Sequence, residues 1–140
     1  MKAIYIKEYG SAQQLTEGEL PHPAIDDQQV LIKVKAAAIN PVDWMVREGM
    51  LKESVSHSLP LVLGWDAAGV ISELGKDVKD FALGDEVFVY SPISDQGSYA
   101  QYIAVDANIV ARKPTSLDIT TSAAVPLAAT TAFQALTQGG

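Results

Sequence analysis

Short segments in which branched apolar residues alternate with polar ones recur along most of the chain. This period of two predicts strands that bury one face. Turn-forming residues separate the segments, among them Gly10, the Gly84–Asp85 pair and the stretch Asp95–Gly97. Short strands at irregular spacing favour a barrel or a sandwich over a doubly wound parallel sheet. The expected strands cover Ala3–Lys7, Val30–Ala36, Val70–Leu74, Glu86–Tyr90 and Tyr99–Val105.

Two other stretches predict helices. Asp43–Leu51 can form a short helical turn that Asp43 caps and that ends at Gly49. Beyond Ser116 the alternation stops, and the stretch from Asp118 to Gln138 is rich in Ala, Thr and Leu. Pro126 lies inside this stretch, where a proline removes a backbone hydrogen bond and clashes with the preceding turn. We therefore expect two helices, or one broken helix, at this end of the chain.

Composition narrows the class of protein. The chain has 140 residues, 48% of them hydrophobic and 19% charged, which is typical of a globular domain with a real core. Its formal net charge of −7 argues against nucleic acid and against an anionic membrane as partners. No apolar run reaches the roughly 18 residues that span a bilayer, and charges interrupt the N-terminal segment. We expect a cytoplasmic protein with small-molecule or protein partners.

The residues that bind metals are almost missing. The chain has no cysteine, which excludes disulfides, thiol nucleophiles and thiolate ligands. Only His22 and His57 carry an imidazole, and they lie too far apart in the sequence to indicate a metal pair. We therefore expect no metal site.

The most family-specific pattern in the sequence is a set of spaced glycines. The segment Gly64–Gly75, with Val78 and Gly84–Val87 after it, resembles the glycine signature of the medium-chain dehydrogenase/reductase superfamily. That signature begins Gly-His-Glu, and here Trp65 and Asp66 stand at the His and Glu positions. Glycines in such a strand serve tight turns and close backbone approach. Four further segments resemble the superfamily in the same order: Met1–Ile4, Val30–Asp43, Gly97–Tyr102 and Ala123–Leu127.

The resemblance implies a mainly β fold. It predicts a GroES-like, partly open barrel with short helices as the catalytic domain over residues 1–115. It also predicts a helical segment over residues 116–140 that leads toward a Rossmann domain. No glycine-rich dinucleotide loop followed by a helix is present in the 140 residues.

The resemblance also implies which branch of the superfamily is relevant. Asn40 occupies the position of a cysteine zinc ligand in zinc-dependent relatives, and Trp65 that of a histidine ligand. An indole offers an N–H donor but no lone pair for a metal. The zinc-free quinone oxidoreductases are therefore the natural comparison, and zinc is not expected.

Site residues follow from the same resemblance. Asn40, Asp43 and Thr131 match positions beside the nicotinamide in zinc-free quinone reductases. Each also has an ordinary structural role: Asn40 as a turn starter, Asp43 as a helix cap and Thr131 as a mid-helix residue. Some quinone reductases have a tyrosine where this chain has Met45, so no catalytic residue is assigned.

Aromatic residues are candidates for the substrate cleft. Trp44, Trp65 and Tyr90 could stack on a flat quinone or enone. Packing in the core is the competing interpretation for all three.

Two functions follow as expectations. In the first, the full-length parent is an NADPH-dependent, zinc-independent oxidoreductase that passes hydride to a quinone or an α,β-unsaturated carbonyl. The 140 residues alone would then bind no cofactor tightly and would be inactive. In the second, the chain is a non-catalytic binding or assembly module that self-associates through its C-terminal helix.

Overall fold

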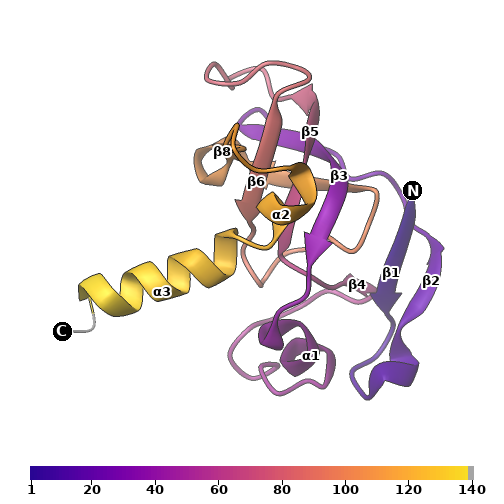
Figure 1. Cartoon of the computed structure of the whole chain (residues 1–140). Helices are drawn as coiled ribbons and strands as arrows, with labels where there is room; N and C mark the ends of the chain where they lie inside the picture. The colour runs from indigo at the N-terminus through magenta and orange to yellow at the C-terminus, as the bar shows by residue number, and fades with distance from the viewer. Residues whose placement is uncertain (139–140) are drawn as a thin grey trace.

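The computed structural model describes residues 1–138 as two antiparallel sheets that do not close into a barrel (Figure 1). The three-stranded sheet has the order β2 (Thr16–Glu19), β1 (Lys2–Ile6) and β4 (Leu61–Val62). The five-stranded sheet has the order β7 (Tyr102–Asp106), β3 (Gln29–Ala38), β5 (Asp66–Leu74), β6 (Glu86–Tyr90) and β8 (Ala111–Arg112). The mainly β, partly open fold expected from the sequence is confirmed.

The helices are short except for the last one. Two 3₁₀ turns lie at Ala12–Gln14 and Ala107–Ile109, and three α-helices are α1 (Pro41–Arg47), α2 (Ile119–Ala123) and α3 (Pro126–Gln138). Pro126 begins α3, where a proline leaves no helical hydrogen bond unmade. The expected break at this residue is confirmed. Within residues 1–138, no helix is both long enough and apolar enough to cross a membrane.

The main core lies on one face of the five-stranded sheet. Alternate residues of β3, β6 and β7 point into it, among them Val30 and Ile32 of β3 and Val87 of β6. A second core cluster contains Trp65 and brings together Val46 of α1, Ile6 of β1 and Leu61 of β4. This burial of every second residue is the period of two from which the strands were predicted.

Strand β5 is longer than expected because it begins at Asp66 rather than at Val70. Its first part, Asp66–Gly69, is buried on both faces, so no alternation of apolar and polar residues marks it as a strand. A Cβ atom on Gly69 would collide with the carbonyl oxygen of Lys33 on the neighbouring strand β3. The glycine therefore lets β3 and β5 approach closely at this point.

Other boundaries differ too. Strand β7 begins at Tyr102 rather than at Tyr99, because residues 99–101 turn toward β1, where Ala3 and Ala100 form an isolated bridge. Helix α1 begins at Pro41 and its N-cap is Asn40, so the expected position of the cap was wrong. Asp43 caps the helix from its third residue instead, because its side chain accepts from the Asn40 backbone N–H. The proline pre-forms the first helical turn and places Asp43 inside it.

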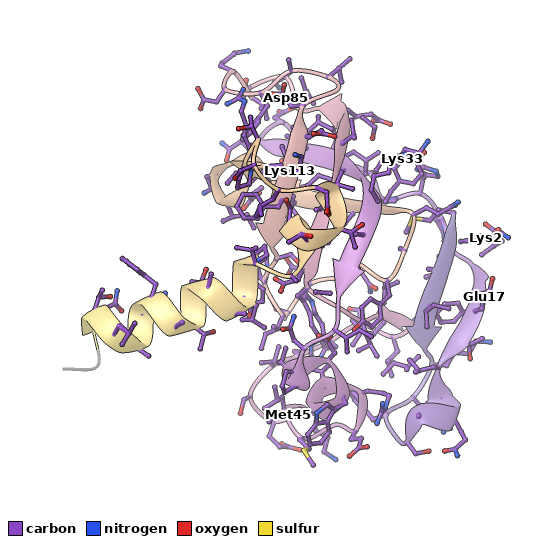
Figure 2. All side chains as sticks on the ribbon, viewed as in Figure 1. Lys2, Glu17, Lys33, Met45, Asp85 and Lys113 are labelled. Atoms are coloured by element: carbon purple, nitrogen blue, oxygen red, sulfur yellow. The ribbon has the colours of Figure 1, made fainter. Side chains whose placement is uncertain are left out.

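Helix α3 extends away from the two sheets (Figures 1 and 2). Every residue from Ala128 to Gln138 is exposed, including Phe133 at 65% and Leu136 at 85% exposure. No residue of α3 is charged. Its first turn is tied to the rest of the chain, because the backbone N–H of Leu127 donates to the Asp66 carboxylate.

Candidate functional site

The starts of α1 and β5 bring two carboxylates together. Asp43 lies in the first turn of α1, and Asp66 is the first residue of β5. Asn40 bridges them: its backbone N–H donates to Asp43 Oδ2 at 2.7 Å, and its side-chain Nδ2 donates to Asp66 Oδ2 at 3.0 Å. Both aspartates are buried, with 4% and 0% exposure. Buried carboxylates this close to one another are unusual in a purely structural core.

Asp66 also anchors the last helix. The backbone N–H of Leu127, in the first turn of α3, donates to Asp66 Oδ1 at 3.0 Å. Unpaired N–H groups and the helix dipole make a helix N-terminus favourable for a negative charge. The same carboxylate thus joins α3 to the loop that holds Asn40.

Tyr99 completes the network from the other side. Its hydroxyl donates to Asp43 Oδ2 at 2.6 Å. Gly64, with a φ of +80°, leaves room for the Tyr99 ring, because a Cβ at that position would collide with it. The second oxygen, Asp43 Oδ1, is buried and has no hydrogen-bond partner among residues 1–138. An unpartnered buried oxygen is costly unless a ligand or water satisfies it.

Burial governs the protonation of the site. It raises the pKa of Asp43, while the hydrogen bonds from Tyr99 and Asn40 lower it by less. Burial likewise raises the pKa of Asp66, against hydrogen bonds from Asn40 and Leu127, and the nearby charge of Asp43 adds to the rise. Within the described part of the chain, neither carboxylate forms a salt bridge.

The tyrosines beside the carboxylates stay neutral. Burial and then the hydrogen bond to Asp43 raise the pKa of Tyr99. Burial and then the charges of Asp66 and Asp43 raise the pKa of Tyr90. Both phenols therefore keep their protons at neutral pH, and the buried site is rich in hydrogen-bond acceptors.

The raised pKa of Asp43 predicts a pH dependence. A carboxyl group whose pKa is higher in the folded state contributes stability below its unfolded pKa, and this contribution is lost as pH rises through the folded value. We expect the urea midpoint of Asp43→Asn to fall less between about pH 4 and pH 7 than that of the parent chain.

Asp118→Asn is the matched control. Hydrogen bonds from Thr121 lower the pKa of the Asp118 carboxyl, so its contribution is present above the unfolded pKa and is lost in acid. This variant should therefore change the pH dependence in the opposite direction and below about pH 4, and should leave the slope between about pH 4 and pH 7 unchanged. Equal pH profiles for Asp43→Asn and the parent chain would contradict the assignment.

The three aromatic residues expected in the substrate cleft differ in their exposure to solvent. Trp65 is completely buried in the second core cluster, and its Nε1 donates to the backbone oxygen of Asp95 at 3.1 Å. Trp44, on α1, is 44% exposed. Tyr90 is half-buried at the end of β6. Trp44 and Tyr90 therefore have solvent-accessible surface, whereas Trp65 has none.

Thr131 lies on the exposed part of α3, one turn beyond Leu127. Its neighbour Thr130 lines a small cavity of about 290 Å³ together with Tyr90 and Pro126. The structure thus brings Asn40, Asp43 and Tyr90 close to the start of α3. It leaves Thr131 on the open side of that helix.

Sequence reasoning did not name Asp66 and Tyr99 as site residues. Both lie in segments that it did single out: Asp66 takes the Glu position of the glycine signature, and Tyr99 belongs to Gly97–Tyr102. One signal in the sequence could have identified Asp66: it keeps a carboxylate at the Glu position of the signature, although the neighbouring His position is occupied by Trp65.

The residues at the zinc-ligand positions do not fit a metal ion. The side chains of Asn40 and Trp65 both act as hydrogen-bond donors here, toward Asp66 and Asp95. Across residues 1–138, no group of three or more His, Cys, Asp or Glu side chains is placed to hold a metal. The site instead offers an amide, two carboxylates and phenol hydroxyls.

Comparison with known proteins places this geometry in a family. The alcohol dehydrogenase GroES-like domain matches residues 26–115. The chain is 42% identical to the 2-methylene-furan-3-one reductase of Solanum lycopersicum, covering 100% of the chain and 38% of the reductase. It is also 42% identical to a chloroplastic NADPH-dependent alkenal/one oxidoreductase of Arabidopsis thaliana, covering 97% of the chain and 37% of that protein.

Solved structures agree. The quinone oxidoreductase of Coxiella burnetii superimposes with a TM-score of 0.89 at 35% identity, over 99% of this chain and 44% of the other. The Escherichia coli quinone oxidoreductase, solved with NADPH, has a TM-score of 0.89 at 26% identity, over 99% and 41%. The chain thus spans less than half the length of these relatives. The relatives named here are reductases and oxidoreductases of the medium-chain dehydrogenase/reductase superfamily, and the chain itself belongs to the alcohol dehydrogenase GroES-like domain family of that superfamily.

Proposed function

We propose that this chain is the N-terminal catalytic domain of an NADPH-dependent, zinc-independent oxidoreductase that reduces quinones or α,β-unsaturated carbonyls. The observation that carries the proposal is the pair of buried carboxylates bridged by Asn40, where metal ligands would otherwise lie. The relatives include an NADPH-dependent alkenal/one oxidoreductase and quinone oxidoreductases, and their names support the cofactor and the substrate class.

The residues present suit a reduced nicotinamide. The unpartnered oxygen Asp43 Oδ1 is an acceptor without a donor, and Asn40 offers an amide beside it. We propose that Asn40 and Asp43 bind the carboxamide or the ribose, with Thr131 approaching from α3. When bound, the cofactor supplies the hydride.

Without a metal, the substrate oxygen needs another source of stabilisation. Negative charge develops on the carbonyl or quinone oxygen as hydride arrives, and hydrogen-bond donors aimed at that oxygen lower the barrier. Tyr90 is a neutral phenol at the edge of the site, and Trp44 presents an exposed flat indole nearby on α1. We propose that these two line the substrate cleft, while Trp65 supports it from the core.

The proposal divides the chain into a catalytic domain at residues 1–115 and a helical segment at residues 116–140 that leads toward a cofactor domain. The first-turn contact between Asp66 and Leu127 supports this, because it joins α3 to the site while leaving the rest of α3 exposed. It follows that the 140 residues alone bind NADPH weakly and turn over no substrate.

The test compares the purified 140-residue chain with the full-length protein. Each is mixed with NADPH and a simple quinone or enone, and cofactor absorbance is followed. We expect turnover only for the full-length protein, and an Asn40→Ala substitution there should raise the dissociation constant for NADPH, measured by fluorescence. Rapid oxidation by the 140-residue chain, or unchanged cofactor binding in the variant, would refute the corresponding part of the proposal.

A second function rests on α3. Its uncharged, exposed surface with Phe133 and Leu136 favours a non-catalytic role as a binding or assembly module. On this hypothesis the 140-residue chain self-associates, and a Leu136→Asp substitution returns it to a monomer. Light scattering that finds a strict monomer for the parent chain would count against it.

Partners and location remain part of the proposal. We propose small-molecule partners only, with no nucleic acid and no membrane, in keeping with the net charge of −7. A cytoplasmic location is also proposed, although relatives include proteins named as chloroplastic in Arabidopsis thaliana and mitochondrial in Dictyostelium discoideum. Fractionation of cells that express the full-length protein tests it.

A further inference from the structure

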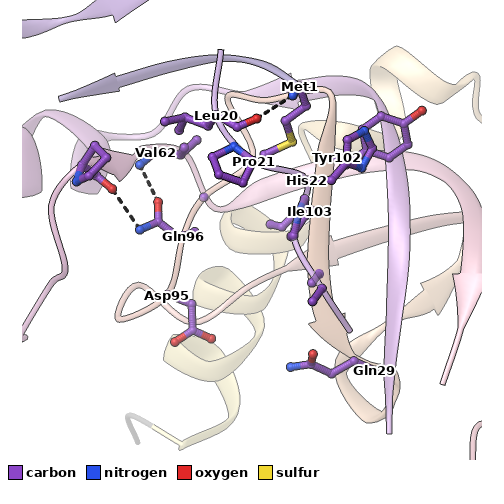
Figure 3. Close-up of a pocket in the computed structure, with 15 residues that line it drawn as sticks. Met1, Leu20, Pro21, His22, Gln29, Val62, Asp95, Gln96, Tyr102 and Ile103 are labelled. Carbon is purple, nitrogen blue, oxygen red and sulfur yellow. Dashed lines mark hydrogen bonds between the residues drawn. The ribbon is translucent and has the colours of Figure 1, made fainter. Parts of the chain in front are cut away.

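A second cavity lies where the two sheets part, on the side of the three-stranded sheet and β7 (Figure 3). Its volume is about 440 Å³, within the range that holds small organic ligands. The segment from Leu20 to Ala24 and the strand β7 both line it. The residues of the carboxylate site described above, Asn40, Asp43, Asp66, Tyr99 and Leu127, are not part of its lining.

Strand β7 presents a free edge to this cavity. It is the end strand of its sheet and pairs only with β3. Val34 N donates to Gln101 O, and Ala107 N donates to Gln28 O, which fixes the antiparallel register. In such a ladder every second residue turns its N–H and C=O away from the neighbouring strand. Tyr102 and Ala104 are those residues, and both line the cavity.

Much of the lining of the cavity is apolar, and one polar side chain in it is already hydrogen-bonded. Pro21, Pro23 and Ile103 supply rigid apolar surface. Figure 3 shows the His22 and Tyr102 rings beside one another, with ring centroids 4.3 Å apart. Gln96 binds its own surroundings: its Oε1 accepts from Val62 N at 2.8 Å and its Nε2 donates to Pro60 O at 3.1 Å. The side-chain amide of Gln96 is therefore already hydrogen-bonded to the protein and helps to fix the shape of the cavity.

Charge and shape define the occupant. No lysine or arginine lines the cavity. The N-terminal ammonium of Met1 does, but it is already paired with Leu20 O and the Glu19 carboxylate, and Asp95 adds a negative charge, so an anion is disfavoured. The outward N–H and C=O of Ala104 are an adjacent donor and acceptor, which match the C=O and N–H of a cyclic amide. An extended peptide would have to displace the segment that places His22 against Tyr102. We propose that this cavity binds a neutral, flat cyclic amide through the edge of β7, with the ring packed against His22.

The probe is 2-quinolone, a flat lactam, and the matched control ligand is N-methyl-2-quinolone, which lacks the N–H donor. Both are titrated into the ¹⁵N-labelled 140-residue chain and followed by amide chemical shifts. We expect 2-quinolone to shift the resonances of Tyr102, Ile103 and Ala104, and N-methylation to weaken binding at least about tenfold.

Two substitutions test the contacts separately. Ala104→Pro removes the outward donor without removing a ladder hydrogen bond and should weaken 2-quinolone binding at least about tenfold. Asp106→Pro is the matched control: this residue also faces outward on β7, its φ of −60° suits proline, and it does not line the cavity. It should leave binding unchanged. His22→Ala, at an exposed position, should weaken binding even if Ala104→Pro misfolds.

Three outcomes would overturn the proposal. The first is no shift with 2-quinolone up to its solubility limit. The second is equal binding of the N-methylated compound. The third is a set of shifts centred on Asp43 and Tyr99 instead of β7, which would locate the ligand in the other site.

Discussion

Replacing Trp65 by alanine is expected to lower the free energy of unfolding by about 3–5 kcal/mol, the usual cost of deleting a large buried aromatic side chain. The indole is completely buried in the core cluster that also contains Ile6 of β1, Val46 of α1 and Leu61 of β4. Its loss leaves a cavity at the centre of the second core cluster and leaves the backbone oxygen of Asp95 without its donor. Urea unfolding followed by far-ultraviolet circular dichroism measures the effect.

The second tryptophan of the chain is the matched control. Trp44 is 44% exposed, so Trp44→Ala should change stability by no more than about 1 kcal/mol. The comparison separates core packing from cleft lining. If Trp65→Ala left stability unchanged and altered only ligand binding in the full-length protein, the core assignment would be wrong.

The second large effect concerns Asp66. Asp66→Leu leaves Asn40 Nδ2 and the Leu127 N–H without their acceptor, and each unsatisfied buried donor costs about 1–3 kcal/mol. Removing a buried carboxylate with a raised pKa recovers part of this cost. We expect a net loss of about 2–4 kcal/mol and faster hydrogen exchange in the first turn of α3.

Asp66→Asn distinguishes charge from hydrogen bonding. The amide keeps one acceptor oxygen and has no charge to desolvate, so this variant should stay close to the parent in stability at neutral pH. Hydrogen exchange at Leu127 should stay slow in Asp66→Asn and become fast in Asp66→Leu. Equal protection of Leu127 in both variants would show that the carboxylate does not hold α3.

The sequence predicted the fold best where burial alternates. Strands β3 and β6 have one buried and one more exposed face over most of their length, and their periodicity located them. The start of β5 was missed because Ala67, Ala68 and Gly69 are small residues buried on both faces. Short strands such as β4 and β8, of two residues each, carry no period at all.

The site was predicted in part. Asn40 and Asp43 were named because the resemblance aligned them with positions beside the nicotinamide, and the structure brings these two residues together. Asp66 and Tyr99 were not, because their role depends on contacts between segments far apart in the sequence. Whether an indole packs in the core or lines a cleft also depends on tertiary packing, so the sequence left both options open for Trp65.

The uncharged surface of α3 has a practical consequence. Salt screens interactions between charges, and α3 has none to screen. A partner that binds to Phe133 and Leu136 should therefore stay bound at high ionic strength, and its affinity should increase in ammonium sulfate. A mild non-ionic detergent, in contrast, should release it.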